Sequence, residues 1–359
     1  MQKYKLNYRD LVRQDGNFRK KGDHLRVQTI LPVMRLIGWC KNIDCECEHN
    51  FRRIFRPSVM TALVQQKYLR PYSAAYGWRL TPAGYAWLSE QGFPMQADRH
   101  TQRVNRRFEN AAVILTMYAA GIDPFANSLA ALREKDGYLS ASVLRGREGQ
   151  HPLGINLVSG FRRLGSTMFS VHYPQTAQRV IIQREIDCAQ SAMLGSGCTE
   201  QAYLLCGSSY TDIYRALLEE QTSCTGKRVS YARFYQQISP AYLLPCNKDG
   251  VLQLRLMQVT NYRPRLAKML GAPITGTHLS DCDFFSADFQ FPARIVADME
   301  LRQVFRAAQQ ARAAGYHGLL LAAFESQKRF LTQIFPPPFF HVAVIDEQAL
   351  CILEMGADL

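Results

Sequence analysis

The sequence predicts an α+β protein, in which a small N-terminal domain of helices and one hairpin is followed by a larger α/β domain with a mixed sheet. Three observations predict this fold class. Residues 51–92 carry a helical pattern, two short strands around a turn and a second helical pattern, in that order. Residues 123–359 alternate short apolar runs with helical patterns. The 359 residues are 47% hydrophobic and 20% charged, which is enough for two domains with buried cores.

The elements of the N-terminal domain are expected as follows. Apolar residues recur at helical spacing from about residue 25 until Gly38, with Pro32 as a kink or boundary. Residues 39–49 are expected to form a loop, and a helix follows from Pro57. Strands at 69–72 and 78–80 flank a turn, and Thr81-Pro82 supplies the N-cap and first position of the next helix.

The stretch Arg-Leu-Thr-Pro-Ala-Gly, Arg79 to Gly84, closes the hairpin and resembles the end of a winged helix-turn-helix domain. Over residues 23–121 the arrangement is also similar to the replication-relaxation proteins of bacterial plasmids and integrative elements. In those proteins a winged helix is followed by a basic helix and a larger α/β domain. The resemblance implies a DNA-binding protein that acts in replication, mobilisation or regulation of a mobile element.

These patterns divide the chain into a basic arm at 1–22, a winged helix at 23–95, a basic connecting helix at 96–122 and an α/β domain at 123–359. The net charge is +13, and residues 1–110 carry 20 Lys and Arg against 9 Asp and Glu. Clustered positive charge attracts polyanions, so DNA, double-stranded by preference, is the expected partner. A basic composition also occurs in proteins that bind no nucleic acid.

A charged N-terminus, with no apolar run near the roughly 18–20 residues of a membrane span, predicts a cytoplasmic protein without membrane contact. The ten cysteines are expected to be buried thiols in a reducing compartment. A homodimer and a partner protein at the C-terminal domain are further expectations, and no cofactor is expected.

In a winged helix, residues just before the recognition helix contact phosphates, and outward residues one turn further contact base edges. This geometry assigns phosphate contacts to Arg52, Arg53 and Arg56 and base contacts to Ser58, Thr61 and Gln65. Glutamine can pair with adenine, although an ordinary exposed helix face explains Gln65 equally well. The remaining candidates for DNA contact are Arg79 at the hairpin and Arg103, Arg106 and Arg107 on the next helix.

Two other kinds of chemistry are considered. Cys40, Cys45, Cys47 and His49 offer four zinc ligands within ten residues, but the spacing is not that of a standard zinc knuckle, and a cysteine-rich loop without metal is the alternative. For a metal-dependent nuclease or nickase, the nearest residues are Asp281, Asp283, Glu325 and Lys328. None of the 11 lysines follows an Asp or Glu by two positions, as the usual nuclease motif requires. The sequence therefore leaves catalysis unproven, with a protein-binding adaptor as another alternative.

In the second domain we expect strands interleaved with helices. The clearest unit is a strand–helix–strand crossover from Leu319 to Val344, which predicts a parallel pair. Strands are expected at 138–144, 154–158, 167–173, 179–183, 202–206, 251–256, 318–324 and 340–345, and helices at 212–220, 262–270, 298–314 and 326–335.

Overall fold

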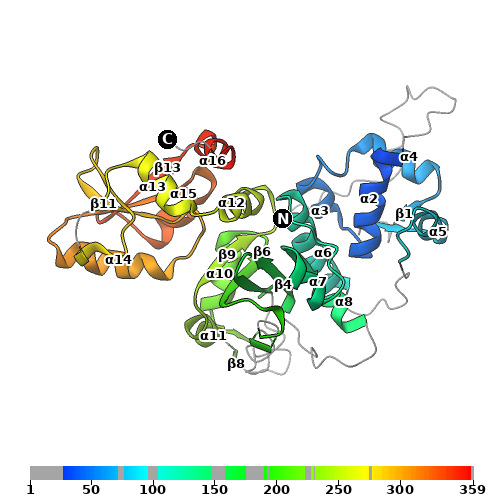
Figure 1. Cartoon of the computed structure of the whole chain (residues 1–359), viewed down its shortest axis with the longest axis horizontal. Coiled ribbons are helices and arrows are strands. Elements are labelled where there is room, and N and C mark those ends of the chain that lie inside the picture. The colour runs from blue at the N-terminus through cyan, green and yellow to red at the C-terminus, as the bar shows by residue number, and fades with distance from the viewer. Residues whose placement is uncertain are drawn as a thin grey trace. The chain divides into compact units, whose positions relative to one another are not determined.

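The computed structural model describes residues 27–71, 77–95, 104–146, 158–174, 190–191, 194–222, 228–229, 231–274 and 277–356. The chain is α+β and divides into two compact units, residues 1–119 and 120–359, coloured blue to teal and green to red in Figure 1. The expected basic arm and Arg103 lie outside the described residues. No helix in the described ranges has both the length and the apolar character needed to cross a membrane.

The described part of unit 1 begins with three helices, α2 (Val27–Cys40), α3 (Cys45–Asn50) and α4 (Pro57–Gln65). The hairpin strands β1 (Leu69–Pro71) and β2 (Trp78–Leu80) follow and pair antiparallel, with Leu69 opposite Leu80. Next come α5 (Pro82–Glu90) and α6 (Val104–Ala119). The α4 helix, the hairpin and α5 are confirmed close to their predicted bounds. The Thr81 side chain caps α5 as predicted, because its hydroxyl oxygen accepts a hydrogen bond from the Gly84 N–H at 3.1 Å.

Two predictions for the start of unit 1 are wrong. Gly38 does not end α2, which continues to Cys40. A Cβ on Gly38 would lie 2.8 Å from the Met95 sulfur and 3.0 Å from a Leu80 methyl, so this glycine serves close packing. Part of the expected loop 39–49 is helix α3, capped by Asp44, whose Oδ1 accepts from the Cys47 N–H at 2.7 Å. An aspartate followed by acidic residues is a helix-start signal that the cysteine content obscured.

The first sheet of unit 2 has the strand order β3-β4-β5-β6-β9. Its strands are β3 (Gly137–Ser140), β4 (Val158–Leu164), β5 (Thr167–His172), β6 (Glu200–Gly207) and β9 (Ala241–Pro245). The β3-β4-β5 part is antiparallel and the β5-β6-β9 part is parallel, so the sheet is mixed as predicted. The other elements of this part are α7 (Leu129–Glu134), α8 (Ala141–Gly146), α10 (Tyr210–Leu218), β7 (Gln221–Thr222), β8 (Arg228–Val229) and α11 (Ala232–Gln237).

The second sheet has the order β10-β11-β12-β13. Its strands are β10 (Phe284–Ser286), β11 (Phe291–Ile295), β12 (Leu319–Phe324) and β13 (Phe340–Ile345). Only β10 runs antiparallel to its neighbour, and the predicted parallel crossover from β12 to β13 is confirmed. The helices are α12 (Lys248–Gln258), α13 (Tyr262–Leu270), α14 (Arg302–Ala313), α15 (Glu325–Ile334) and α16 (Glu347–Glu354), with a short 3₁₀ turn, η1 (Thr277–Leu279).

Several strand predictions in unit 2 are wrong. Residues 251–256 belong to α12, which Asn247 caps by accepting from the Asp249 N–H at 2.9 Å. Residues 141–144 begin α8, and β9, β10 and β11 were not predicted. The short apolar runs are too brief for periodicity to distinguish a strand from a helix. At 251–256 the Asn247 cap is the signal that indicates a helix. The expected strand 179–183 and most of 154–158 lie outside the described residues.

One apolar core cluster is shared by the two sheets of unit 2. It includes Leu205 and Leu243 of the first sheet, Leu321 of the second, and Val304 of α14. A buried glutamine pair crosses the same region: the Gln253 amide donates to Leu243 O at 2.8 Å and Asp298 O at 2.7 Å, while the Gln327 amide donates to the Tyr210 hydroxyl at 3.1 Å. The two Gln253 bonds satisfy buried backbone carbonyls, and the Gln327 bond satisfies the buried Tyr210 hydroxyl.

Candidate nucleic-acid interface

The α3 and α4 helices of unit 1 are joined by a tight connection anchored in the core. Phe51 and Phe55 are buried at 4% and 0% exposure, and the Phe55 N–H donates to Phe51 O at 3.0 Å. Between and after these two rings, Arg52, Arg53 and Arg56 are all exposed. The alternation of buried phenylalanine and exposed arginine therefore places three cations in the connection that leads into α4.

The α4 helix has one apolar and one polar side. Val59, Met60 and Leu63 are buried, whereas Ser58 and Gln65 are exposed and Thr61 is half-buried. Pro57 occupies the first turn, and Arg56, the N-cap residue, makes no side-chain cap. The exposed arginines lead directly along the chain into the polar side of α4, and we call the six residues Arg52, Arg53, Arg56, Ser58, Thr61 and Gln65 the α4 face.

The hairpin is fixed to the helices through Ile43 and Trp78. Ile43 and Trp78 exchange two backbone hydrogen bonds of 3.0 and 2.7 Å, so that residue 43 extends the hairpin as a third strand position. The Trp78 indole N–H donates to Glu48 Oε2 of α3 at 2.7 Å. Gly77 has φ of +81°, and a Cβ there would lie 1.8 Å from Ile43 O. These contacts therefore hold the hairpin beside α3.

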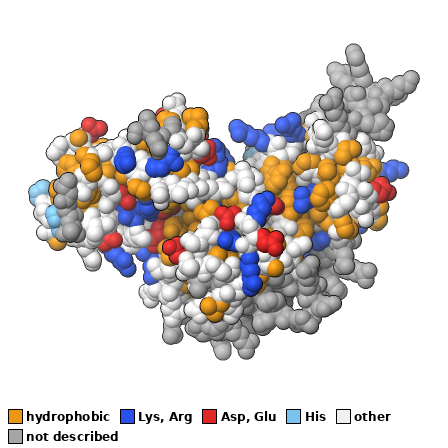
Figure 2. Space-filling model, in the orientation of Figure 1, with side chains coloured by type: hydrophobic (Ala, Val, Ile, Leu, Met, Phe, Trp, Pro, Cys, Tyr) orange, Lys and Arg blue, Asp and Glu red, His pale blue; other side chains and the backbone are white. Residues whose placement is uncertain are grey.

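The arginines of the hairpin differ in exposure. Arg70 lies opposite Arg79 in the β1–β2 register, and Arg70 is exposed while Arg79 is half-buried. Sequence reasoning selected Arg79 and missed Arg70, although the alternation of Leu69 inward and Arg70 outward in a strand indicates its exposure. On the face seen in Figure 2, Lys and Arg side chains stand at the upper edge of unit 1.

The described arginines of the α6 helix are partly covered. Arg106 and Arg107 are half-buried, and the polar Asn110 one turn further on is 8% exposed. From Ala111 to Met117, residues on every side of the helix are buried or half-buried. Burial also raises the pKa of Glu109 to about 7, with the Arg106 charge opposing the shift. Arg106 and Arg107 therefore present only part of their side chains to solvent, and their contact with DNA stays a prediction.

The cysteines and histidine considered for zinc do not form a metal site. Cys40 is buried at the end of α2, while Cys45 and His49 are exposed on α3 and Cys47 of that helix is buried. Burial raises the pKa of both the Cys40 and the Cys45 thiols, which disfavours the thiolate that zinc binds. Across all the residues described, no three His, Cys, Asp or Glu side chains are grouped to hold a metal ion.

The four residues considered for catalysis are also not brought together. Asp281 accepts from the Gln310 side chain at 2.8 Å. Asp283 pairs with two arginines, as described below. Glu325 and Lys328 are exposed on the first turn of α15.

The surroundings of Asp283 are an internal ion-pair network that sequence reasoning missed. Its carboxylate lies 3.4 Å from both Arg263 and Arg294 and accepts from the Ile295 N–H at 2.7 Å. Arg263 also pairs with Asp298, which is fully buried. Burial raises the pKa of Asp283, and the Arg294 and Arg263 charges oppose that shift. Arginines thus take the place beside the carboxylate that a divalent metal would need.

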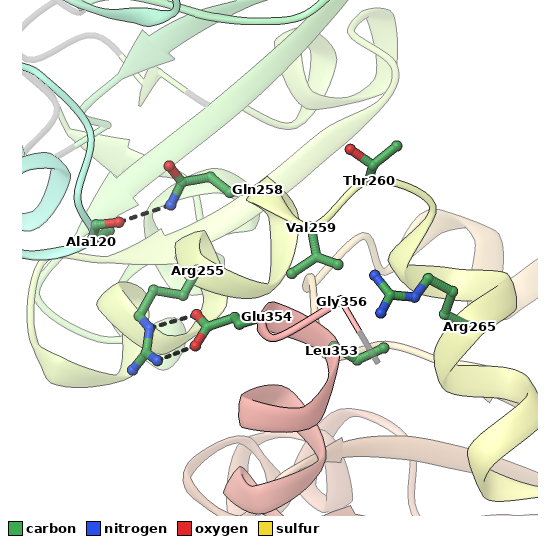
Figure 3. Close-up of a pocket in the computed structure, with 9 residues that line it drawn as sticks. All are labelled: Ala120, Arg255, Gln258, Val259, Thr260, Arg265, Leu353, Glu354 and Gly356. Carbon is green, nitrogen blue, oxygen red and sulfur yellow. Dashed lines mark hydrogen bonds and ion pairs between the residues drawn. The ribbon is translucent and has the colours of Figure 1, made fainter. Parts of the chain in front are cut away.

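Unit 2 has a surface pocket of about 440 Å³ lined by residues of α12, α13 and α16. Figure 3 shows two pairs among its lining residues: the Arg255 Nε donates to Glu354 at 2.8 Å, and the Gln258 amide donates to Ala120 O at 2.8 Å, whereas no such pair joins Thr260 and Arg265. Such pairing stabilises the pocket wall and leaves few groups to recognise a ligand, so we assign no function to it.

Comparison of the chain with protein-family models, with characterised proteins and with solved structures found no match. The chemistry of the α4 face therefore carries the functional argument.

Proposed function

We propose that unit 1 is a winged helix-turn-helix domain that binds double-stranded DNA, with α4 as its recognition helix. The observation that carries this proposal is the α4 face, in which three exposed arginines continue directly into the exposed polar side of one short helix. In helix-turn-helix proteins the second helix lies in the major groove while neighbouring groups hold the phosphate backbone. α3 and α4 supply those two helices, and the hairpin supplies the wing.

Each residue of the α4 face has a role in this proposal. Arg52, Arg53 and Arg56 neutralise phosphates, which gives affinity without sequence preference. Ser58, Thr61 and Gln65 face base edges, and a glutamine amide can pair with adenine through two hydrogen bonds. Arg70 at the hairpin is placed to contact the neighbouring phosphates. The resemblance to replication-relaxation proteins would set this binding in the replication, mobilisation or regulation of a mobile element.

The test is a titration of the full chain against a pool of fragments from its own genome at two salt concentrations. Arg53→Ala should weaken binding to all fragments alike and reduce the dependence of log K on log salt by about one. Gln65→Ala should weaken the selected site by roughly 5- to 150-fold while leaving non-specific binding unchanged. Arg306→Ala, which removes an exposed arginine on α14, is the matched control and should change neither.

Two results would contradict the proposal. If binding is equal for all fragments and disappears at the higher salt, the basic surface attracts DNA only through non-specific electrostatic interactions. An equal loss with Arg306→Ala and Arg53→Ala would show that the α4 face is not the contact surface. Retention of one fragment that Gln65→Ala abolishes would establish sequence reading by α4.

A further inference from the structure

The two larger sheets of unit 2 have four edge strands, and other segments of the chain close three of them. At β3, the Tyr138 N–H donates to Asp123 O at 2.8 Å. At β9, the Leu243 N–H donates to Met299 O at 3.3 Å, and Leu243 O accepts from the Gln253 side chain. At β10, Phe285 and Ala272 exchange two backbone bonds of 3.0 and 2.8 Å. Edge strands are commonly blocked in this way because unpaired backbone groups attract other strands.

The fourth edge, β13, has no such cover among the described residues. Its one partner strand there is β12. The Phe339 C=O accepts from the Leu319 N–H at 2.9 Å, so residue 339 points its backbone groups toward β12. The backbone N–H and C=O groups of successive residues point to opposite sides of a strand. Those of Phe340, Val342 and Val344 therefore point away from β12. A row of donors and acceptors about 13 Å long is therefore presented outward.

The side chains of β13 lack the features that normally protect an edge. Its sequence, Phe-His-Val-Ala-Val-Ile, contains no lysine, acidic residue or proline. Val344 is 42% exposed. The half-buried Phe340 ring packs on the buried Phe335, with ring centroids 5.0 Å apart, and Phe335 in turn packs on Phe305, 5.4 Å away and 55% exposed. An open strand edge with exposed apolar side chains is a typical site of strand addition.

We propose that β13 pairs antiparallel with β13 of a second copy of this chain, so that two four-stranded sheets join across a twofold axis. The outward direction of residues 340, 342 and 344 sets the register, with Val342 opposite Val342 of the partner copy and Phe340 opposite Val344. Every outward N–H and C=O of these three residues then has a partner.

The self-complementarity of the strand favours a second copy over an unrelated peptide. Phe340 and Val344 form an aromatic–β-branched pair, which is a favourable cross-strand combination, and the twofold axis creates it twice. No like charges face each other, because β13 carries no Lys, Arg, Asp or Glu. The contact is also closed, since pairing consumes the open edge and a third copy finds none there. The inference does not depend on DNA binding by unit 1.

The test is the mass of the full chain in solution without DNA, measured by sedimentation from about 1 to 100 µM. We expect a species of twice 40.9 kDa. Val342→Pro removes an N–H that points away from β12, so the ladder to β12 persists while the dimer should weaken by roughly tenfold or more. Val344→Lys, which places a charge against Phe340 of the partner, should do the same.

Met355→Lys is the matched control, because it changes an apolar side chain that is 75% exposed at the end of α16 and should leave the dimer intact. Far-UV circular dichroism establishes that each variant is folded. A wild-type chain that stays monomeric at the highest concentration would overturn the proposal. A dimer that persists unchanged in both β13 variants would also overturn it, because another surface would then hold the two copies together.

Discussion

The carboxyl group of Glu109 on α6 should make the free energy of unfolding depend on pH. The substitution Glu109→Gln should remove this contribution. Burial raises the pKa of Glu109 from 4.5 to about 7, against the Arg106 charge. A carboxylate whose pKa is raised by folding opposes folding when it is ionised. The penalty is absent below about pH 4.5, grows as the pH rises to about 7 and is constant above that.

The magnitude follows from the two pKa values. At 1.36 kcal/mol per pKa unit, the ionised group costs up to about 3 kcal/mol at pH 8 and about 1 kcal/mol at pH 5. Glu109→Gln, which imitates the protonated acid, should therefore raise the free energy of unfolding by about 2 kcal/mol more at pH 8 than at pH 5.

The assay is urea unfolding at these two pH values, followed by far-UV circular dichroism. Glu90→Gln, a change at an exposed carboxylate on α5, is the matched control and should alter stability by less than about 0.5 kcal/mol at either pH. A gain from Glu109→Gln that is equal at pH 5 and pH 8, or larger at pH 5, would refute the reasoning that burial raises this pKa.

Three further predictions concern stability measured by thermal unfolding. Gly77→Ala should cost more than about 2 kcal/mol, because its Cβ would lie 1.8 Å from Ile43 O, whereas Gly92→Ala, with φ of +83° but nothing within 4 Å, should cost only about 1 kcal/mol. Arg162→Met should be neutral or stabilising by up to about 4 kcal/mol, because this guanidinium is 1% exposed and has no hydrogen-bond partner in the described structure. Gln327→Leu should cost about 2–4 kcal/mol, because it leaves buried backbone groups unpaired.

Each of these predictions has a clear contrary result. Equal losses at Gly77 and Gly92 would mean that the hairpin can move away from residue 43. A large loss with Arg162→Met would reveal a partner for the guanidinium, whose pKa burial lowers to about 10. A neutral Gln327→Leu would show that the buried network between the sheets contributes little to stability.

Local sequence signals predicted part of this fold well. Pro57, Thr81 and Pro82 mark helix starts through properties of the residues themselves, and the hairpin and the β12–α15–β13 crossover followed from clear apolar runs between such signals. The α4 face could also be expected, because a helix that buries Val59, Met60 and Leu63 must turn Ser58 and Gln65 outward.

Other features depended on contacts between distant residues. Residues 251–256 are apolar enough for a strand, and their helix is decided by the Asn247 cap and by packing in unit 2. The clustering of Asp283 with Arg263, Arg294 and Asp298 brings together three parts of the sequence, and no spacing rule indicates it.

The sequence by itself determined the α+β class, the basic character of the first 110 residues and the polar side of α4, because composition and periodicity act over one or two turns. The tertiary structure alone decided that Arg106 and Arg107 are partly covered, that Asp283 faces arginines, and that β13 has β12 as its one partner strand among the described residues. Burial and strand order are properties of neighbours in space, and a residue's neighbours in sequence do not specify them.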